Sequence, residues 1–190
     1  MKDYFDDIRS ISKKDFIDLF RKHETKRPKK DKFMFDMIKV HKETNDAAYY
    51  QGSLNQAGLN NIVVPHNAVE IESGRDPDRP VAVGGELMTS VINKFKKFQM
   101  NGRFPGRLDK IRSETEVFFD GKELEDFVEA DFLYVSNSRD LAHSGNEHYH
   151  AKHEENKLYI GNGFHRFIAY ALWVDKVGFK PIRIYYCEGL

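Results

Sequence analysis

Apolar side chains recur at helical spacing in four parts of this chain, the last of them after residue 164. The first part covers residues 12–24, where Ser12 has the side chain of a helix N-cap and Asp15 follows three residues later, as in a capping box. Residues 33–40 predict a second helix, rich in phenylalanine and methionine. Residues 84–100 predict a third, because apolar residues return there at steps of three and four.

Short apolar runs between turn signals predict strands at residues 62–64, 117–119, 131–135, 158–160 and 181–186. Residues 47–56 show neither period and are predicted as a short helical or irregular stretch. This arrangement is typical of an α+β protein. We expect a helical N-terminal portion, residues 1–60, and a small mixed-sheet domain within residues 61–190.

The segment around which a function is predicted covers residues 157–171, KLYIGNGFHRFIAYA. An apolar run ends at Gly161, Asn162 and Gly163, and helical periodicity resumes at His165 and Arg166. This pattern predicts a strand, a tight glycine turn and a helix. Glycine lets the backbone approach a ligand closely or adopt a positive φ. The first turn of a helix offers free N–H groups and the positive end of its dipole.

A phosphate group is the ligand that such a turn suits, and the predicted nucleotide-binding residues are Gly161, Asn162, Gly163, His165 and Arg166. Arg166 has a permanently charged fork that fits phosphate oxygens, and His165 can donate a hydrogen bond or move a proton near neutral pH. The alternative is structural, with the glycines required for packing and the arginine solvated. The motif is neither a Walker loop nor a dinucleotide fingerprint.

The last third of the chain resembles the C-terminal core of the ParB/sulfiredoxin superfamily. In that family a strand, a loop, a second strand, a G-x-H-R or G-x-R-R turn, a helix and a final strand follow in this order. Here the corresponding segments are DFLYVSN, residues 138–156, KLYIGNG, FHRFIAYALW and PIRIYYCE. Gly163, His165 and Arg166 match the family's glycine and basic pair, which the resemblance implies are contacts to nucleotide phosphates.

The resemblance implies nucleotide or phosphate chemistry without choosing the reaction, because the family includes kinases, ATPases and nucleases. Phe164 stands where the sulfiredoxin branch has its catalytic cysteine, so sulfinic acid reductase activity is not expected. The partitioning-protein branch has an acidic-Arg-Arg motif where this chain has Phe-His-Arg, a departure from the CTP-clamp proteins. We expect ATP or CTP with Mg²⁺ as the cofactor.

Phosphoryl transfer also needs a carboxylate that activates the acceptor or holds Mg²⁺. Glu86, Asp120 and Asp131 are the candidates, and Glu86 is expected in the first turn of the third helix. An acidic residue there also suits the helix dipole alone. We therefore predict four catalytic residues: His165, Arg166, Glu86 and Asp131.

Two basic segments suggest contacts to nucleic acid. Residues 26–32 are rich in lysine, and residues 94–112 contain further lysines and arginines around a Pro-Gly pair. A patch of this kind can hold a phosphate backbone or a polyphosphate. The alternative for each segment is a solvated surface. The predicted nucleic-acid contacts are Lys94, Lys97, Arg103 and Arg107.

Four of the eight histidines of the chain lie within residues 143–153. On an extended segment His148 and His150 would point the same way, with His153 close behind. Converging imidazoles bind Zn²⁺, Mn²⁺ or Ni²⁺, so these three histidines are the predicted ligands of a transition metal. The alternative is a solvated polar loop.

Charge and composition narrow the class of protein. The 30 basic residues balance 30 acidic ones, so an overall attraction to nucleic acid is not expected. The single cysteine, Cys187, excludes an internal disulfide. No apolar run reaches the ~18 residues of a membrane span, and the first residues lack a signal-peptide pattern. We expect a cytoplasmic protein that does not enter membranes.

These patterns together predict an enzyme of the ParB/sulfiredoxin type. It would bind a nucleotide and catalyse phosphoryl transfer or phosphodiester cleavage on or near DNA or RNA, as an accessory protein of a plasmid or phage. One alternative is a non-catalytic nucleotide- or DNA-binding accessory protein. Another is a metal-dependent nuclease that uses residues 143–153.

Overall fold

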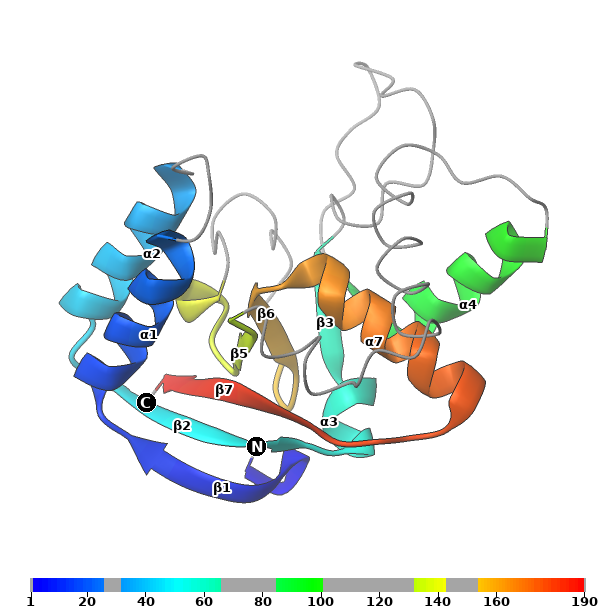
Figure 1. Cartoon of the computed structure of the whole chain (residues 1–190), viewed down its shortest axis with the longest axis horizontal. Coiled ribbons are helices and arrows are strands. Elements are labelled where there is room, and N and C mark those ends of the chain that lie inside the picture. The colour runs from blue at the N-terminus through cyan, green and yellow to red at the C-terminus, as the bar shows by residue number, and fades with distance from the viewer. Residues whose placement is uncertain (1, 26–31, 66–84, 101–131, 143–153, 190) are drawn as a thin grey trace.

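A seven-stranded mixed sheet forms the centre of the computed structural model, which describes residues 2–25, 32–65, 85–100, 132–142 and 154–189 (Figure 1). The strand order is β1-β2-β7-β5-β6-β3-β4. β5 runs parallel to β7 and β3 runs parallel to β6, whereas the other neighbours are antiparallel. The strands are β1 (Phe5–Ile11), β2 (Ala47–Leu54), β3 (Ile62–Pro65), β4 (Gly85–Leu87), β5 (Tyr134–Ser136), β6 (Leu158–Asn162) and β7 (Ile182–Gly189).

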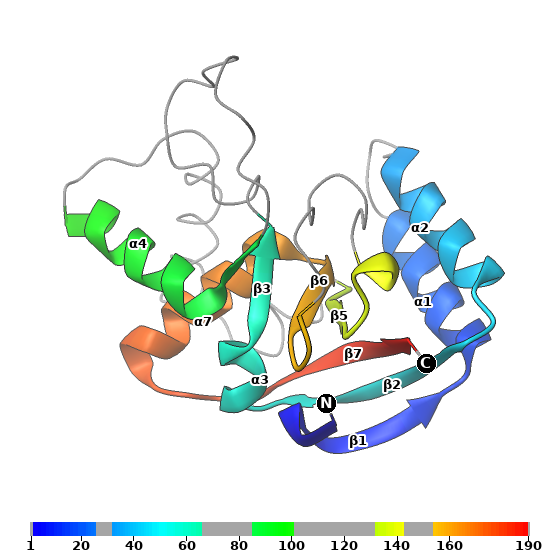
Figure 2. The same ribbon diagram turned by 180° about the vertical axis from the view of Figure 1, so that it is seen from behind.

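Helices cover both sides of this sheet. Figures 1 and 2 show α1 and α2 together on one side of β5 and β6, with α4 and α7 on the other. Among the described helices, none combines the length and the apolar character that crossing a bilayer requires. The helices are α1 (Lys13–Thr25), α2 (Lys32–Glu43), α3 (Gln56–Asn60), α4 (Met88–Met100) and α7 (Phe164–Val177), with short 3-10 turns η1 (Lys2–Tyr4) and η3 (Arg139–Leu141).

The last strand, β7, contributes side chains to two hydrophobic clusters, one on each face of the sheet. Its residues Ile184 and Tyr186 belong to the core cluster that includes apolar residues of α4 and α7. Tyr185 and Cys187 instead contact the aromatic cluster formed with α1 and α2. Because successive side chains of a strand point to opposite faces, a central strand buries residues of both sets.

The start of α1 forms as its sequence predicts. The hydroxyl of Ser12 accepts a hydrogen bond from the Asp15 N–H at 3.0 Å and donates to the Asp15 carboxylate at 2.7 Å. The N–H of Phe16 bonds to the Ser12 carbonyl at 3.0 Å and begins the helical ladder. The helix predicted at residues 33–40 and the strand predicted at residues 62–64 are also confirmed, as α2 and β3.

Two predictions of local structure are wrong. Ala47–Leu54, predicted as helical or irregular, is strand β2, which pairs with β1 and β7 along its length. Gly85–Leu87, predicted as the start of a helix, is strand β4, and α4 begins only at Met88. In both cases pairing with a strand that is distant in sequence decides the structure. The N-terminal portion therefore supplies two strands to the same sheet as the C-terminal strands.

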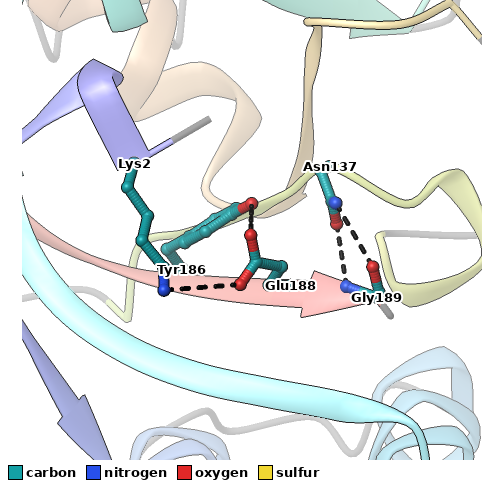
Figure 3. A network of polar contacts seen from close by, with 5 residues as sticks. All are labelled: Lys2, Asn137, Tyr186, Glu188 and Gly189. Carbon is teal, nitrogen blue, oxygen red and sulfur yellow. Dashed lines mark hydrogen bonds and ion pairs between the residues drawn. The ribbon is translucent and has the colours of Figure 1, made fainter.

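A polar network fixes the end of β7 (Figure 3). The side-chain amide of Asn137 donates to the Gly189 carbonyl at 3.3 Å, and its oxygen accepts from the Gly189 N–H at 2.8 Å. The ammonium group of Lys2 lies 3.9 Å from a Glu188 carboxylate oxygen and 4.6 Å from the centre of the Tyr50 ring. Asn137 thus acts as one more peptide unit on the β5 side of the strand end, beyond Ser136, the last residue of β5 that pairs with β7.

Candidate phosphate-binding turn

The turn between β6 and α7 has the strand–glycine–helix form that the sequence predicts. β6 ends at Asn162, Gly163 adopts a left-handed conformation with φ of 93° and ψ of 37°, and α7 begins at Phe164. The Phe167 N–H bonds to the Gly163 carbonyl at 2.9 Å. No side chain caps the helix at Gly163, and the first turn contains no acidic residue. The positive end of the α7 dipole is therefore not offset from within its own first turn.

A β-bulge precedes this turn. Tyr134 of β5 pairs with Asn162, but the next residue, Val135, pairs with Ile160. Gly161 is therefore the extra residue of β6, opposite no partner on β5. A Cβ atom at Gly161 would overlap the ring of Tyr134, which lies over the backbone at this point. Glycine is required here because a neighbouring ring occupies the space of a side chain.

The two residues after the bulge are also held by β5 or by the residues just before it. Asn162 is buried, and its side-chain amide donates to the Phe132 carbonyl. A Cβ at Gly163 would overlap the side chain of Leu133, and the positive φ disfavours any other residue. Packing thus accounts for both glycines.

Because β3 runs parallel to β6, the late residues of both strands lie at the same end of the sheet, and Glu86 of β4 lies beside the late residues of β3. Val63 of β3 pairs with Tyr159 of β6, and Val64 pairs with Glu86 of β4. The backbone of Glu86 consequently lies two strand spacings, about 10 Å, from β6. Glu86 belongs to a strand and not to the first helical turn that the sequence predicted. The structure describes its backbone but not its side chain.

The other predicted site residues are placed only in part. Arg166 is half-buried in the first turn of α7, whereas the side chain of His165 is not described. Lys94 and Lys97 lie on α4, also without described side chains. Several predicted residues lie outside the described ranges, together with the strand predicted at residues 117–119: Arg103, Arg107, Asp120, Asp131, His148, His150 and His153.

The metal site remains a prediction for the same reason. Within the described part of the chain, no group of three or more His, Cys, Asp or Glu side chains is arranged to hold a metal ion. The three histidines proposed as ligands are not in that part.

A cavity of about 370 Å³ lies away from the turn, between α3, α4 and α7. Its apolar floor includes Leu59 and Ile92, and its rim carries the polar side chains of Asn60 and Asn93. Asp175, also at the rim, pairs with Lys96 at 2.7 Å. None of the predicted site residues lines this cavity.

Sequence reasoning missed a buried polar cluster on the side of the sheet covered by α1 and α2. His41 is fully buried, with Nδ1 at 3.2 Å from the Tyr49 hydroxyl and Nε2 at 3.3 Å from the Tyr134 hydroxyl. The Cys187 sulfur lies 4.0 Å from Nδ1. Burial, and then the positive charge of Lys13, lower the pKa of His41 to about 4. The available signal was the position of His41 four residues after Met37, on the apolar face of α2.

Comparisons with protein-family models, with curated proteins and with solved structures found no match to this chain. The order of strand, loop, strand, glycine turn, helix and strand that suggested the ParB/sulfiredoxin resemblance is present between β5 and β7. That order is a property of this fold, and the relationship itself stays a prediction.

Proposed function

We propose that this protein binds a nucleotide through its phosphate groups at the β6–α7 turn. One observation carries the proposal: the 14-residue helix α7 starts from a left-handed glycine with no capping side chain and no acid in its first turn. Three successive first-turn N–H groups lack a partner in their own helix, at the positive end of its dipole. Arg166 and His165 add a charged fork and a donor in the same turn.

We further propose that the bound nucleotide is used in phosphoryl transfer or phosphodiester cleavage, on or near DNA or RNA. Arg166 would neutralise charge that develops on the transferred group, and His165 would donate to a bridging or terminal oxygen. Glu86 is the candidate carboxylate at the same sheet edge. ATP or CTP would arrive as its Mg²⁺ complex, so the metal would belong to the substrate.

A second candidate is a non-catalytic protein that holds the nucleotide without consuming it. The distance between β4 and β6 favours this candidate. The backbone of Glu86 is about 10 Å from that of β6, so in this candidate the first-turn amides, Arg166 and His165 hold the phosphate without a carboxylate from their own element. Turnover separates the two candidates.

Binding is tested by thermal unfolding with ATP, CTP and GTP, each with and without Mg²⁺. A nucleotide present at about a hundred times its dissociation constant should add roughly 2.7 kcal/mol to the free energy of unfolding. Arg166→Ala should lose most of that gain. Arg183→Ala is the matched control, because Arg183 is exposed on β7. If no nucleotide stabilises the wild type, or if both variants keep the full gain, the proposal is wrong.

Turnover is tested by following conversion of the bound nucleotide to its diphosphate or monophosphate, and cleavage of the added nucleic acid, with and without DNA or RNA. The catalytic proposal predicts one of these products with the wild type and its loss in Glu86→Gln, with binding retained. Binding without any such product would support the second candidate instead.

A further inference from the structure

Three consecutive residues of one segment hold the three residues of the turn. The ring of Tyr134 covers Gly161, the carbonyl of Phe132 accepts from Asn162, and the side chain of Leu133 fills the space beside Gly163. Leu133 and Tyr134 are both buried at 2% exposure or less. The conformation of residues 161–163 is therefore set by residues 132–134 and not by the turn alone.

Tyr134 is itself fixed by the helices α1 and α2. Its ring packs edge-on against Phe16, with centroids 5.3 Å apart, and against Phe20, with centroids 5.6 Å apart. Its hydroxyl is 3.3 Å from Nε2 of His41. A neutral imidazole donates from one nitrogen and accepts at the other, and a tyrosine hydroxyl can do either, so this bond forms with either tautomer.

We infer that Tyr134 is a positioning residue for the phosphate-binding turn: its ring sets the bulge at Gly161 and thereby the direction of the first-turn amides of α7. The extra residue of a bulge has no ladder partner, so steric contact with a neighbour decides its conformation. A flat ring over a glycine provides such a contact, whereas a smaller branched side chain leaves a gap beside a residue with no Cβ. The statement that this arrangement matters for phosphate binding rests on the proposed function. The statement that Tyr134 sets the direction of the amides does not.

The test compares backbone amide spectra of the full chain and its titration with sodium tripolyphosphate. Tyr134→Leu removes the ring, and Tyr134→Phe keeps it while losing the hydroxyl. Tyr186→Leu is the matched control. Tyr186 is an equally buried tyrosine on β7 whose ring stacks on Phe5, in the other core cluster.

In Tyr134→Leu, the ¹H–¹⁵N signals of residues 161–166 should move, and tripolyphosphate should bind about tenfold more weakly or worse, as expected when charge-assisted hydrogen bonds lose their alignment. Tyr134→Phe should keep both the signals and the affinity. Tyr186→Leu should lower stability but leave the signals of residues 161–166 in place. If Tyr134 had only a structural role, Tyr134→Leu and Tyr186→Leu would affect those signals alike.

Gly161→Ala offers a second route if Tyr134→Leu does not fold, because it displaces the ring without removing it. It should move the same amide signals. The double variant Gly161→Ala/Tyr134→Leu should move them less than Gly161→Ala does, since the added methyl group then enters space that the ring has left.

Unmoved signals in both Tyr134→Leu and Gly161→Ala, or equal movement in Tyr186→Leu, would overturn the inference. The proposed function fails separately. If the signals respond as expected but tripolyphosphate binds to no protein, the wild type included, Tyr134 still positions the turn and the turn is not a phosphate site.

Discussion

At the scale of single residues, His41 is a titratable side chain buried inside an aromatic cluster. It is fully buried among Phe16, Tyr49 and Tyr134, and Lys13 of α1 adds a positive charge nearby. Burial also raises the pKa of the neighbouring Cys187 thiol to about 12. The thiol therefore stays protonated and unreactive at neutral pH, and the cluster serves to join α2 to three strands.

Neutral His41 makes stability depend on pH in a defined direction. Its pKa falls from 6.5 in the unfolded chain to about 4 in the fold. Between these values the unfolded state binds more protons than the folded state. The contribution of His41 to folding stability is therefore fully present above pH 6.5 and is lost as pH falls toward 4. The loss amounts to about 3 kcal/mol.

Urea unfolding of the wild type and His41→Gln across this pH range measures the effect. The wild type should lose about 3 kcal/mol more than the variant on acidification, because glutamine does not titrate. Carboxylates elsewhere affect both proteins alike and cancel in the difference. Parallel pH curves for the two proteins would show that His41 is not the group responsible.

At the scale of elements, local patterns predicted those structures whose cause is local. Ser12 and Asp15 mark the start of α1, and Gly163 marks the start of α7. β2 gave no such signal because its two tyrosines, Tyr49 and Tyr50, are adjacent and its apolar residues do not alternate with polar ones. Its strand structure comes from pairing with β1 and β7, which are far away in the sequence. The same holds for the site: the glycine turn was visible in the sequence, but its contact with Tyr134 was not.

On its β5 side the end of β7 is held by the side chain of Asn137, and Asn137→Ala tests how firmly. The substitution removes the pair of hydrogen bonds between the Asn137 amide and the Gly189 backbone. We expect a loss of about 1–2 kcal/mol in unfolding free energy. Hydrogen exchange should accelerate at the last residues of β7 before the rest of the strand.

Two further variants sharpen this experiment. Asn137→Asp keeps the acceptor for the Gly189 N–H and loses only the donor, so its effect should be no larger than that of alanine, which loses both hydrogen bonds. Lys2→Met, which removes the exposed ion pair with Glu188 shown in Figure 3, should leave exchange at Gly189 unchanged. Equal effects of Lys2→Met and Asn137→Ala would mean that the whole network, and not Asn137, holds the strand end.

At the scale of the whole molecule, the sheet connects the two parts that the sequence divided at residue 60. β2 lies between β1 and β7, and it pairs with β7 from Ala47–Gly189 to Leu54–Ile182. The aromatic cluster likewise joins Phe16 and Phe20 to Phe132 and Tyr134. The N-terminal helices therefore support the candidate turn through Tyr134, although no residue before 61 was predicted to contact the glycine turn.

This connection predicts that residues 61–190 do not fold alone. Without residues 1–60 the chain would expose the edge of β7, which β2 covers, and the buried rings of Phe132 and Tyr134, which α1 covers. Each large apolar side chain that loses its burial costs about 1.5–3 kcal/mol, and a whole domain is stable by only about 5–15 kcal/mol. The isolated segment should show poor amide dispersion and no cooperative thermal transition.

Residues 1–60 supplied as a separate chain provide the control, because pairing of β2 with β7 should restore the dispersion of residues 132–136 and of the turn at residues 161–166. Restored helicity without those signals would mean that the two pieces associate without rebuilding the sheet. A segment 61–190 that unfolds cooperatively by itself, with the turn signals of the full chain, would instead establish a domain boundary near residue 60. Tyr134 would then not need α1 and α2 to hold the turn.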